Sequence, residues 1–278
     1  EFWQSRQTLR GCKEMKNSMS SHAAKSSRWA DLGPRTASAL VLLLVGGGAS
    51  YLGGVAFALF VSLSVGAVFW EVTRMYRKDN SLVAVGYGVA AAALVFLACF
   101  MPLIVAVPVI ALPLLLGIRV LEQRKTSFLV ILAWVLLGGF GLVWLRDAFW
   151  VSWTVWLICV VVATDVAGYF AGKYFGGPKF WPSISPKKTW SGTSAGWVGA
   201  GVIGIIFALY TETGLGLVVI SMVVAFASQL GDIAESFIKR KMGVKDSSSL
   251  IPGHGGLLDR FDGMLGASVF LLVLMQFI

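Results

Sequence analysis

Charged residues are scarce in this sequence. Asp, Glu, Lys and Arg make up 13% of its 278 residues, whereas the hydrophobic set accounts for 57%. A soluble globular domain carries roughly 25% charged residues, so the composition excludes an ordinary water-soluble globule. The bilayer is therefore expected to be the main solvent of this chain.

Cysteines are also few, and their positions exclude two common kinds of small scaffold. Cys12, Cys99 and Cys159 lie far apart, and two of them fall in apolar runs. This spacing is typical neither of a disulfide framework nor of a zinc site. The sequence likewise lacks a charged and then apolar segment followed by a small-residue cleavage site, so no cleaved signal peptide is predicted.

Long apolar stretches recur from Leu40 to Ile278, and short polar segments separate them. Each stretch is close to the ~20 residues that cross the hydrocarbon core as a helix. The predicted fold class is therefore all-α, a polytopic integral membrane protein with about nine transmembrane helices. The predicted spans are about 36–53, 54–72, 82–99, 101–118, 127–145, 149–171, 194–211, 214–234 and 258–278.

Glycine and proline mark the turns between spans that follow each other closely. The glycines at 46–48 and 53–54 are expected to form a turn between the first two spans, and Pro102 one between the third and fourth. These turns divide two stretches that would otherwise resemble single long helices.

The basic residues sort to one side of the predicted spans. With the N-terminus in the cytoplasm, all of the 23 Lys and Arg residues except Arg146 fall in cytoplasmic segments. Positively charged loops stay in the cytoplasm, so the N-terminus is predicted to be cytoplasmic and the C-terminus extracytoplasmic. The formal charge of +9 then reflects topology, and no nucleic acid partner is expected. The predicted domains are a basic, disordered cytoplasmic tail at 1–35 and a transmembrane domain at 36–278.

One cytoplasmic segment combines glycines, hydroxyls and lysines. It runs from Asp165 through Lys173 and Lys179 to the sequence Ser-Pro-Lys-Lys-Thr-Trp at 185–190. Such a loop can present backbone N–H groups and ammonium charges to a polyphosphate. It is not a Walker loop, because Tyr174 stands where a hydroxyl residue would meet magnesium. A solvated loop without a function is the alternative interpretation.

A second segment aims acidic and basic side chains at one place. If the eighth span continues into the cytoplasm as a helix, four polar side chains share one face at i, i+3, i+4 and i+7, namely Asp232, Glu235, Ser236 and Lys239. Asp232 lies at the membrane end of the span, where an ionisable residue is costly and by default marks a site.

Two further aspartates approach the same depth from the last span. Only 16 residues follow Asp262, about 24 Å of helix, so Asp259 and Asp262 must lie close to the interface if that span crosses ~30 Å. Neighbouring carboxylates repel each other unless a cation neutralises them, and Mg²⁺ is a usual partner where phosphates are handled. A divalent cation is therefore the hypothesis, and ion pairs that cap a helix are the alternative.

The motif at 236–262 resembles the long signature of the phosphatidate cytidylyltransferase family. It reads Ser-Phe-Ile-Lys-Arg at 236–240, Lys-Asp at 245–246 and Pro-Gly-His-Gly-Gly-Leu-Leu-Asp-Arg-Phe-Asp at 252–262. The segment 165–190 is similar to the second motif of that family, and the likeness covers roughly residues 36–278. One departure is that Ser191 and Gly192 follow Trp190 where the family usually has Glu-Gly.

The resemblance implies roles for residues of both segments. Asp232 and Asp259 would hold the catalytic metal, Mg²⁺, with Asp246 and Asp262 as further candidates for contacts to metal or substrate. Lys239 would join these aspartates as a catalytic residue. The residues expected to contact the phosphates of CTP or phosphatidate, or to line the same pocket, are Ser185, Lys187, Lys188, Thr189, Ser236, Arg240, Lys245, His254 and Arg260.

The activity implied by the resemblance is transfer of a cytidylyl group from CTP to phosphatidic acid, which gives CDP-diacylglycerol and pyrophosphate. A bacterial inner membrane location follows, with the active site facing the cytoplasm, and the glycine-rich spans would allow a homodimer. Three alternatives stay open: a CTP-dependent lipid kinase, a cytidylyltransferase for another lipid, and a secondary transporter. The transporter is disfavoured because the acids cluster with lysines at one face and the two halves show no repeat.

Overall fold

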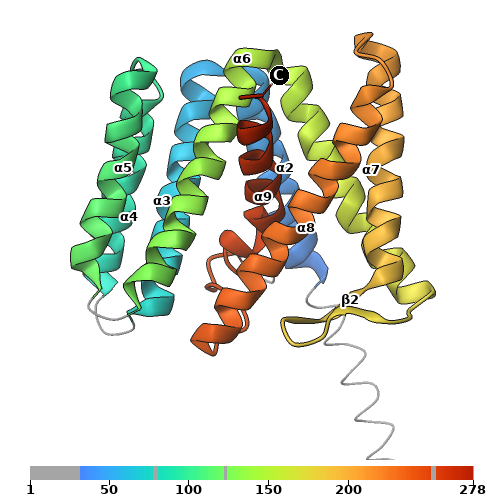
Figure 1. Cartoon of the computed structure of the whole chain (residues 1–278). Helices are drawn as coiled ribbons and strands as arrows, with labels where there is room; N and C mark the ends of the chain where they lie inside the picture. The colour runs from blue at the N-terminus through green and yellow to red at the C-terminus, as the bar shows by residue number, and fades with distance from the viewer. Residues whose placement is uncertain (1–31, 78–80, 122–123, 252–254, 278) are drawn as a thin grey trace, which may run out of the picture.

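The computed structural model describes residues 32–77, 81–121, 124–251 and 255–277. These parts of the chain form a bundle of α-helices with one short hairpin (Figure 1). The helices are α2 (Leu32–Leu52), α3 (Gly54–Tyr76), α4 (Ser81–Ala98), α5 (Leu103–Val120), α6 (Lys125–Tyr174), α7 (Trp190–Thr211), α8 (Gly216–Met242) and α9 (Leu258–Leu274).

Helix α6 is long enough for two membrane crossings. Its 50 residues would extend about 75 Å as a straight helix, more than twice the ~30 Å hydrocarbon core. Trp150 interrupts the helix with φ 69° and ψ 171°. The first half rises through the bundle and the second half descends again (Figure 1).

Five helices of the described chain, α3, α5, α6, α7 and α8, are long and apolar enough to cross a membrane. Each predicted span overlaps one helix or one half of α6. The prediction of an all-α protein with several membrane-spanning helices is therefore confirmed. The count of nine spans and their orientation stay predictions.

The break between α2 and α3 is narrower than predicted. The glycines at 46–48 lie inside α2, so the expectation of a turn is wrong for these three. The chain breaks at Gly53 and Gly54, whose φ angles of 64° and 48° are positive, a region that glycine adopts at little cost. Pro102 directly precedes α5, in agreement with the predicted turn.

A two-stranded antiparallel hairpin follows α6. This hairpin was not predicted from the sequence. Strand β1 (Lys179–Trp181) pairs with β2 (Ser185–Thr189). The Thr189 hydroxyl caps α7, because it accepts a hydrogen bond from the Gly192 N–H at 3.2 Å. The lysines of β2 are thus held beside the start of α7 and do not belong to a free loop.

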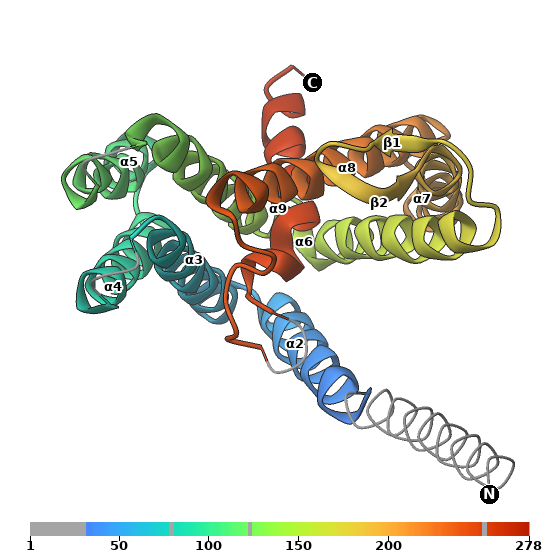
Figure 2. The same cartoon turned by 90° about the horizontal axis from the view of Figure 1, so that it is seen from below.

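The helices form two groups that α6 and α9 connect. Helices α3, α4 and α5 lie side by side in one group, and α7, α8 and the hairpin form the other (Figure 2). Helix α9 packs against both α6 and α8 between the two groups. Helix α2 contacts α3 and diverges from the rest of the bundle (Figure 2).

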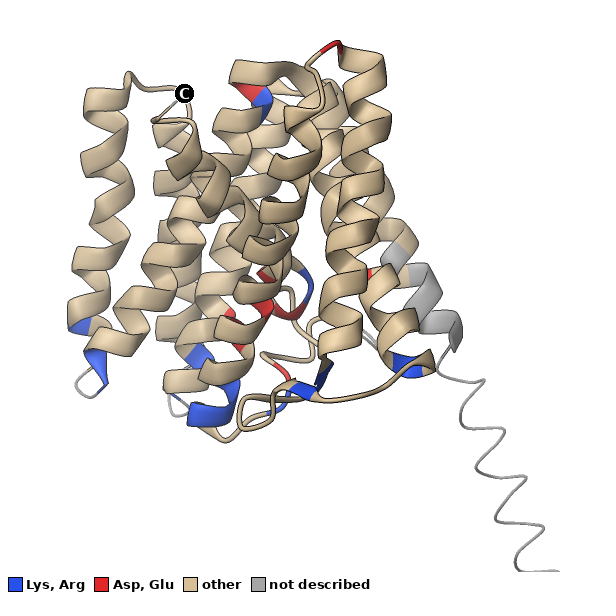
Figure 3. Cartoon of the chain, turned by 45° about the vertical axis from the view of Figure 1, so that its right-hand side comes forward, with Lys and Arg blue, Asp and Glu red and all other residues tan. Residues whose placement is uncertain are grey.

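Lys and Arg residues gather at one end of the bundle, which we call the basic end (Figure 3). The hairpin lies at this end, as does the last turn of α8 with Lys239 and Arg240. Arg146 instead donates hydrogen bonds to the carbonyl oxygens of Ser50 and Tyr51, where α2 finishes. The charge distribution is therefore strongly unequal between the two ends of the helices.

Helices α8 and α9 approach each other at two glycines. A Cβ on Gly266 would lie 2.6 Å from the carbonyl oxygen of Ala227, and one on Gly231 would clash with the carbonyl oxygen of Asp262. A larger residue therefore requires one helix to move. Small residues allow such close helix packing. This crossing brings the acidic residues of α8 and α9 to the same depth.

We expect Gly266→Ala to lower the free energy of unfolding by about 1–3 kcal/mol, because the added methyl group must push α9 away from α8. The midpoint of thermal unfolding in detergent measures this effect. Gly86→Ala is the matched control, since a Cβ on Gly86 would meet no atom within 4 Å. Equal midpoints for the two variants would contradict the close crossing.

Candidate active site

A buried carboxylate from α3 organises the segment that leads into α9. Glu71 has 0% of its surface exposed. Its oxygens accept hydrogen bonds from the N–H groups of Leu257 and Leu258 at 2.7 and 2.8 Å, and from the hydroxyls of Ser247 and Ser248 at 3.1 and 2.7 Å. Glu71 therefore binds both ends of the segment 247–258, at Ser247 and Ser248 and at Leu257 and Leu258, and provides a negative charge at the start of α9, where the helix dipole favours it.

Asp259 is held by four donors from the same region. Its Oδ2 accepts hydrogen bonds from the N–H groups of Ser247 and Gly256 and from the Ser247 hydroxyl, at 2.9, 2.7 and 3.1 Å. Its Oδ1 lies 2.6 Å from Nζ of Lys239. The geometry thus gives Asp259 a role in holding the segment, and its role as a metal ligand stays an untested prediction.

Three other carboxylates converge where α8 crosses α9. One oxygen each of Asp232, Glu235 and Asp262 lies within 4.8 Å of the other two. The predicted common face of α8 is confirmed, because the Ser236 hydroxyl donates to Asp232 at 3.4 Å and Lys239 pairs with Glu235 at 2.6 Å. We call Asp232, Glu235 and Asp262 the carboxylate cluster.

The charge and burial of the carboxylate cluster fit a divalent metal ion. Glu235 is 1% exposed, and its Oε1 has no hydrogen-bond partner among the described residues. With Asp259 included, four carboxylates meet here, and in the described parts of the chain Lys188 and Lys239 are the lysines paired with them. Uncompensated buried charge is costly, and Mg²⁺ binds carboxylate oxygens.

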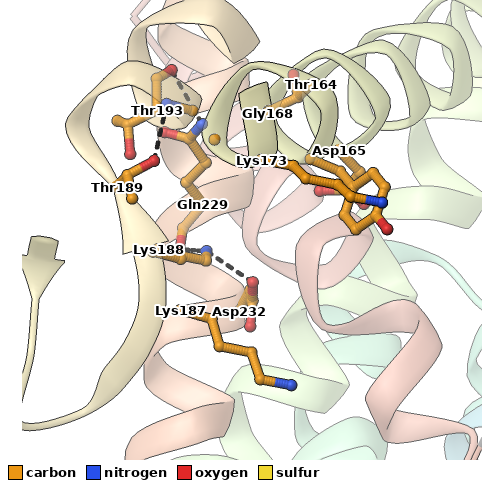
Figure 4. Close-up of a pocket in the computed structure, with 13 residues that line it drawn as sticks. Thr164, Asp165, Gly168, Lys173, Lys187, Lys188, Thr189, Thr193, Gln229 and Asp232 are labelled. Atoms are coloured by element: carbon orange, nitrogen blue, oxygen red, sulfur yellow. Dashed lines mark hydrogen bonds and ion pairs between the residues drawn. The ribbon is translucent and has the colours of Figure 1, made fainter. Parts of the chain in front are cut away.

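A cavity of about 380 Å³ opens beside the carboxylate cluster (Figure 4). It lies between the second half of α6, the hairpin, α7 and α8. A Cβ on Gly192 would lie 2.6 Å from the carbonyl oxygen of Gly168, so α6 and α7 can meet at the cavity only through glycine. The polar side chains that line the cavity are Thr164, Asp165, Tyr169, Lys173, Lys187, Lys188, Thr189, Thr193, Gln229 and Asp232.

Lys188 connects this cavity to the carboxylate cluster. Its Nζ lies 2.6 Å from Oδ2 of Asp232 and donates to the Gln229 carbonyl oxygen at 3.2 Å (Figure 4). The Gln229 side chain accepts a hydrogen bond from the Trp197 indole and donates to the Thr193 carbonyl oxygen, which joins α8 to α7. The cavity can therefore offer ammonium groups to phosphates next to carboxylates that suit a metal.

Ser191 stands outside the cavity lining. Its hydroxyl donates to the carbonyl oxygen of Gly176 and lies 3.0 Å from the Thr189 hydroxyl. The residue that replaces the expected Glu therefore ties the end of α6 to the start of α7.

The structure brings Lys187, Lys188, Thr189 and Asp232 together in the cavity lining, and their roles stay predictions. Ser185 lies on the same hairpin but does not line the cavity.

The remaining predicted substrate residues lie elsewhere. Arg240, Lys245 and Asp246 are exposed at or beyond the end of α8, and none of them lines the cavity. His254 lies outside the described residues. Arg260 lines another, apolar cavity between α2, α3, α6 and α9.

Sequence reasoning did not identify Glu71. A signal was present, because Glu71 is an acid inside the predicted span 54–72, where an ionisable residue by default marks a site. Its partners could not be inferred, since they lie 176 to 187 residues later in the chain. Glu235 was placed on the correct face of α8 but was not assigned to a metal.

Known proteins resemble this chain along most of its length. The model of the cytidylyltransferase family matches residues 34–278. A phosphatidate cytidylyltransferase of Brucella suis biovar 1 is 33% identical over 249 residues, which cover 87% of this chain and 92% of that protein. Proteins of the same name from Bacillus subtilis and Helicobacter pylori are 43% identical over 125 residues and 41% over 143 residues. These two matches cover 44% and 51% of this chain, and 46% and 53% of the respective relative.

We expect Glu71→Ala to destabilise the protein strongly, because the change leaves the N–H groups of Leu257 and Leu258 and the Ser248 hydroxyl without their acceptor. A hydrogen bond to a charged group contributes about 1.5–3 kcal/mol. Thermal unfolding and limited proteolysis of the segment 247–258 measure the loss. Glu212→Ala serves as the control, since Glu212 is exposed, and a similar response of both variants would exclude this role for Glu71.

Proposed function

Because this chain belongs to the cytidylyltransferase family, we propose that it acts as a phosphatidate cytidylyltransferase, which transfers a cytidylyl group from CTP to phosphatidic acid. The observation that carries this conclusion is the likeness to a relative of that name along almost its whole length. The geometry agrees with it, since a lysine-lined cavity adjoins a carboxylate cluster in a protein with membrane-spanning helices. The products are CDP-diacylglycerol and pyrophosphate.

The reaction needs alignment and charge neutralisation more than proton transfer. An oxygen of the phosphatidate monoester forms a bond to the α-phosphorus of CTP, and the bond from that phosphorus to the pyrophosphate oxygen breaks. The attacking oxygen is already anionic, so no strong base is required. Lys173, Lys187 and Lys188 line the cavity, where their ammonium groups suit the triphosphate.

We further propose that the carboxylate cluster holds a divalent cation, Mg²⁺. When bound, the ion would neutralise negative charge on the phosphate oxygens. Asp232 belongs both to the cluster and to the cavity lining, which would place the ion beside the triphosphate. Lys239 pairs with Glu235 and Asp259 and so holds α8 and α9 in register at the cluster.

A bacterial inner membrane location, with the site facing the cytoplasm, is part of this proposal. CTP arrives from water, whereas phosphatidate stays in the bilayer, so the site must be reached from both. The hairpin, whose strand β2 lines the cavity, lies at the basic end (Figure 3). Positively charged segments stay in the cytoplasm, which supports this orientation.

The reaction is tested with CTP labelled on either the α- or the γ-phosphate, given to the purified protein with phosphatidic acid and Mg²⁺ in detergent. We expect α-label in lipid and γ-label in pyrophosphate. Appearance of γ-label in lipid would instead identify a lipid kinase. No labelled lipid from folded protein would reject the transferase and favour a transporter.

The metal proposal predicts that Glu235→Gln and Asp262→Asn each lower kcat by about 100-fold or more, because charge stabilisation at the phosphates is lost. Both variants should also need more Mg²⁺ for half-maximal rate and bind Mn²⁺ more weakly by electron paramagnetic resonance. Asp147→Asn is the control, since this exposed carboxylate lies outside the cluster.

The variant Asp259→Asn distinguishes between two candidate sets of metal ligands. One is the carboxylate cluster, and the other is the pair Asp232 and Asp259 that the sequence predicts. We expect it to lower stability while the folded fraction keeps most of its Mn²⁺ affinity, because Asp259 binds the segment 247–258 and Lys239. Loss of Mn²⁺ binding in Asp259→Asn, with normal binding in Glu235→Gln, would move the metal to the predicted pair.

A further inference from the structure

An apolar groove of about 360 Å³ lies between α2, α3, α6 and α9, away from the lysine-lined cavity. Leu42 and Leu43 of α2 form one wall. Phe60 of α3 and Phe261 of α9 form another, with their ring centroids 6.4 Å apart. The volume falls within the roughly 300–1,000 Å³ of small-molecule pockets.

The groove faces the part of the molecule where α2 leaves the bundle. Helix α2 diverges from the other helices (Figure 2). Its Leu43 and Leu44 are 60% and 71% exposed, so this helix is bordered by lipid in a membrane. A molecule dissolved in the bilayer can therefore reach the groove sideways, without passing through water.

Arg260 gives the groove a positive charge at the end nearest to the candidate active site. Among the described residues that line the groove, it is the charged one. Its neighbours on α9 include Asp262 of the carboxylate cluster. The groove therefore ends on the first turn of α9, the same turn that carries Asp262, and Asp232 of the same cluster lines the lysine-lined cavity.

We infer that this groove holds an acyl chain of the phosphatidic acid substrate, with Arg260 facing its phosphate. The inference rests on the proposed function and adds where the lipid binds. A guanidinium group matches the oxygens of a phosphate monoester, and the apolar walls match the chain. The occupant therefore combines one anionic head with a hydrocarbon tail, the two features that the groove presents.

The groove acts through shape more than through hydrophobic attraction. Lipid tails are as apolar as the groove, so moving an acyl chain from the bilayer into it yields little hydrophobic gain. The walls instead fix the direction of the chain, which aligns the phosphate with the cavity that holds CTP. Filling the groove should then harm the use of long-chain phosphatidate and spare CTP binding.

The variant Gly47→Trp tests whether the groove holds an acyl chain, and Gly48→Trp is its matched control. Gly47 lines the groove and Gly48 does not, and a Cβ on either would meet no atom within 4 Å. We expect Gly47→Trp to raise KM for dioleoyl phosphatidate by about tenfold or more, with KM for CTP and turnover of dihexanoyl phosphatidate close to wild type. Gly48→Trp should resemble the wild type in all three.

A phosphatidate with a diazirine in its acyl chain gives a second readout that needs no turnover. We expect light to cross-link it to α2 or α9 of the wild-type protein and of Gly48→Trp, and much less to Gly47→Trp. Arg260→Gln should reduce cross-linking of this probe but not of the matching diacylglycerol. A loss for both lipids alike would show that Arg260 does not face the phosphate.

The outcomes separate this inference from the proposed function. Normal turnover with the same kinetics in both Trp variants, or cross-links confined to α4, α5, α7 or α8, which do not line the groove, would overturn the groove as the lipid site. A wild-type protein that cross-links the probe in the groove but makes no CDP-diacylglycerol would overturn the proposed reaction and keep the groove as an anionic-lipid site.

Discussion

The burial of Glu71 is the constraint on which the site depends. A carboxylate enclosed between helices is tolerated where hydrogen-bond donors surround it, and those donors come from the segment 247–258. Helix α3 therefore determines where the segment lies and where α9 begins. Asp259 then reaches Lys239, and Lys239 reaches Glu235 on α8. The first half of the chain thus supplies the fixed point from which the acids of the second half are positioned.

Glycine residues allow the close helix contacts that shape the site. The crossing of α8 and α9 at Gly231 and Gly266 brings acids from both helices within reach of one another, and the contact of Gly168 with Gly192 closes α6 against α7 beside the cavity. In a bilayer, side chains gain little from mutual burial, so close backbone contact is a main source of helix association. The same glycines that stabilise the bundle therefore also shape the site.

The positions of the helices could be predicted because their length and apolarity follow from the thickness of the bilayer. The turn expected at 46–48 was wrong because glycine breaks helices mainly in water, whereas membrane helices tolerate it. The hairpin escaped prediction because its strands have three and five residues and are mostly exposed. The acidic face of α8 followed from helical periodicity, but the partners of Asp259 depend on a loop and on a helix far away in the sequence.

The geometry of the first turn of α9 explains the spacing of the two acids and the arginine in the motif. Successive residues of a helix point about 100° apart, so neighbours in sequence address different surroundings. Asp259 binds the segment 247–258, Arg260 lines the apolar groove, and Asp262 faces Asp232 and Glu235. One helical turn therefore contributes to the scaffold, to the proposed lipid site and to the proposed metal site. If any of these three residues moved by one position along α9, its side chain would point toward a different part of the molecule. The spacing of the three residues is therefore a geometric requirement of the site.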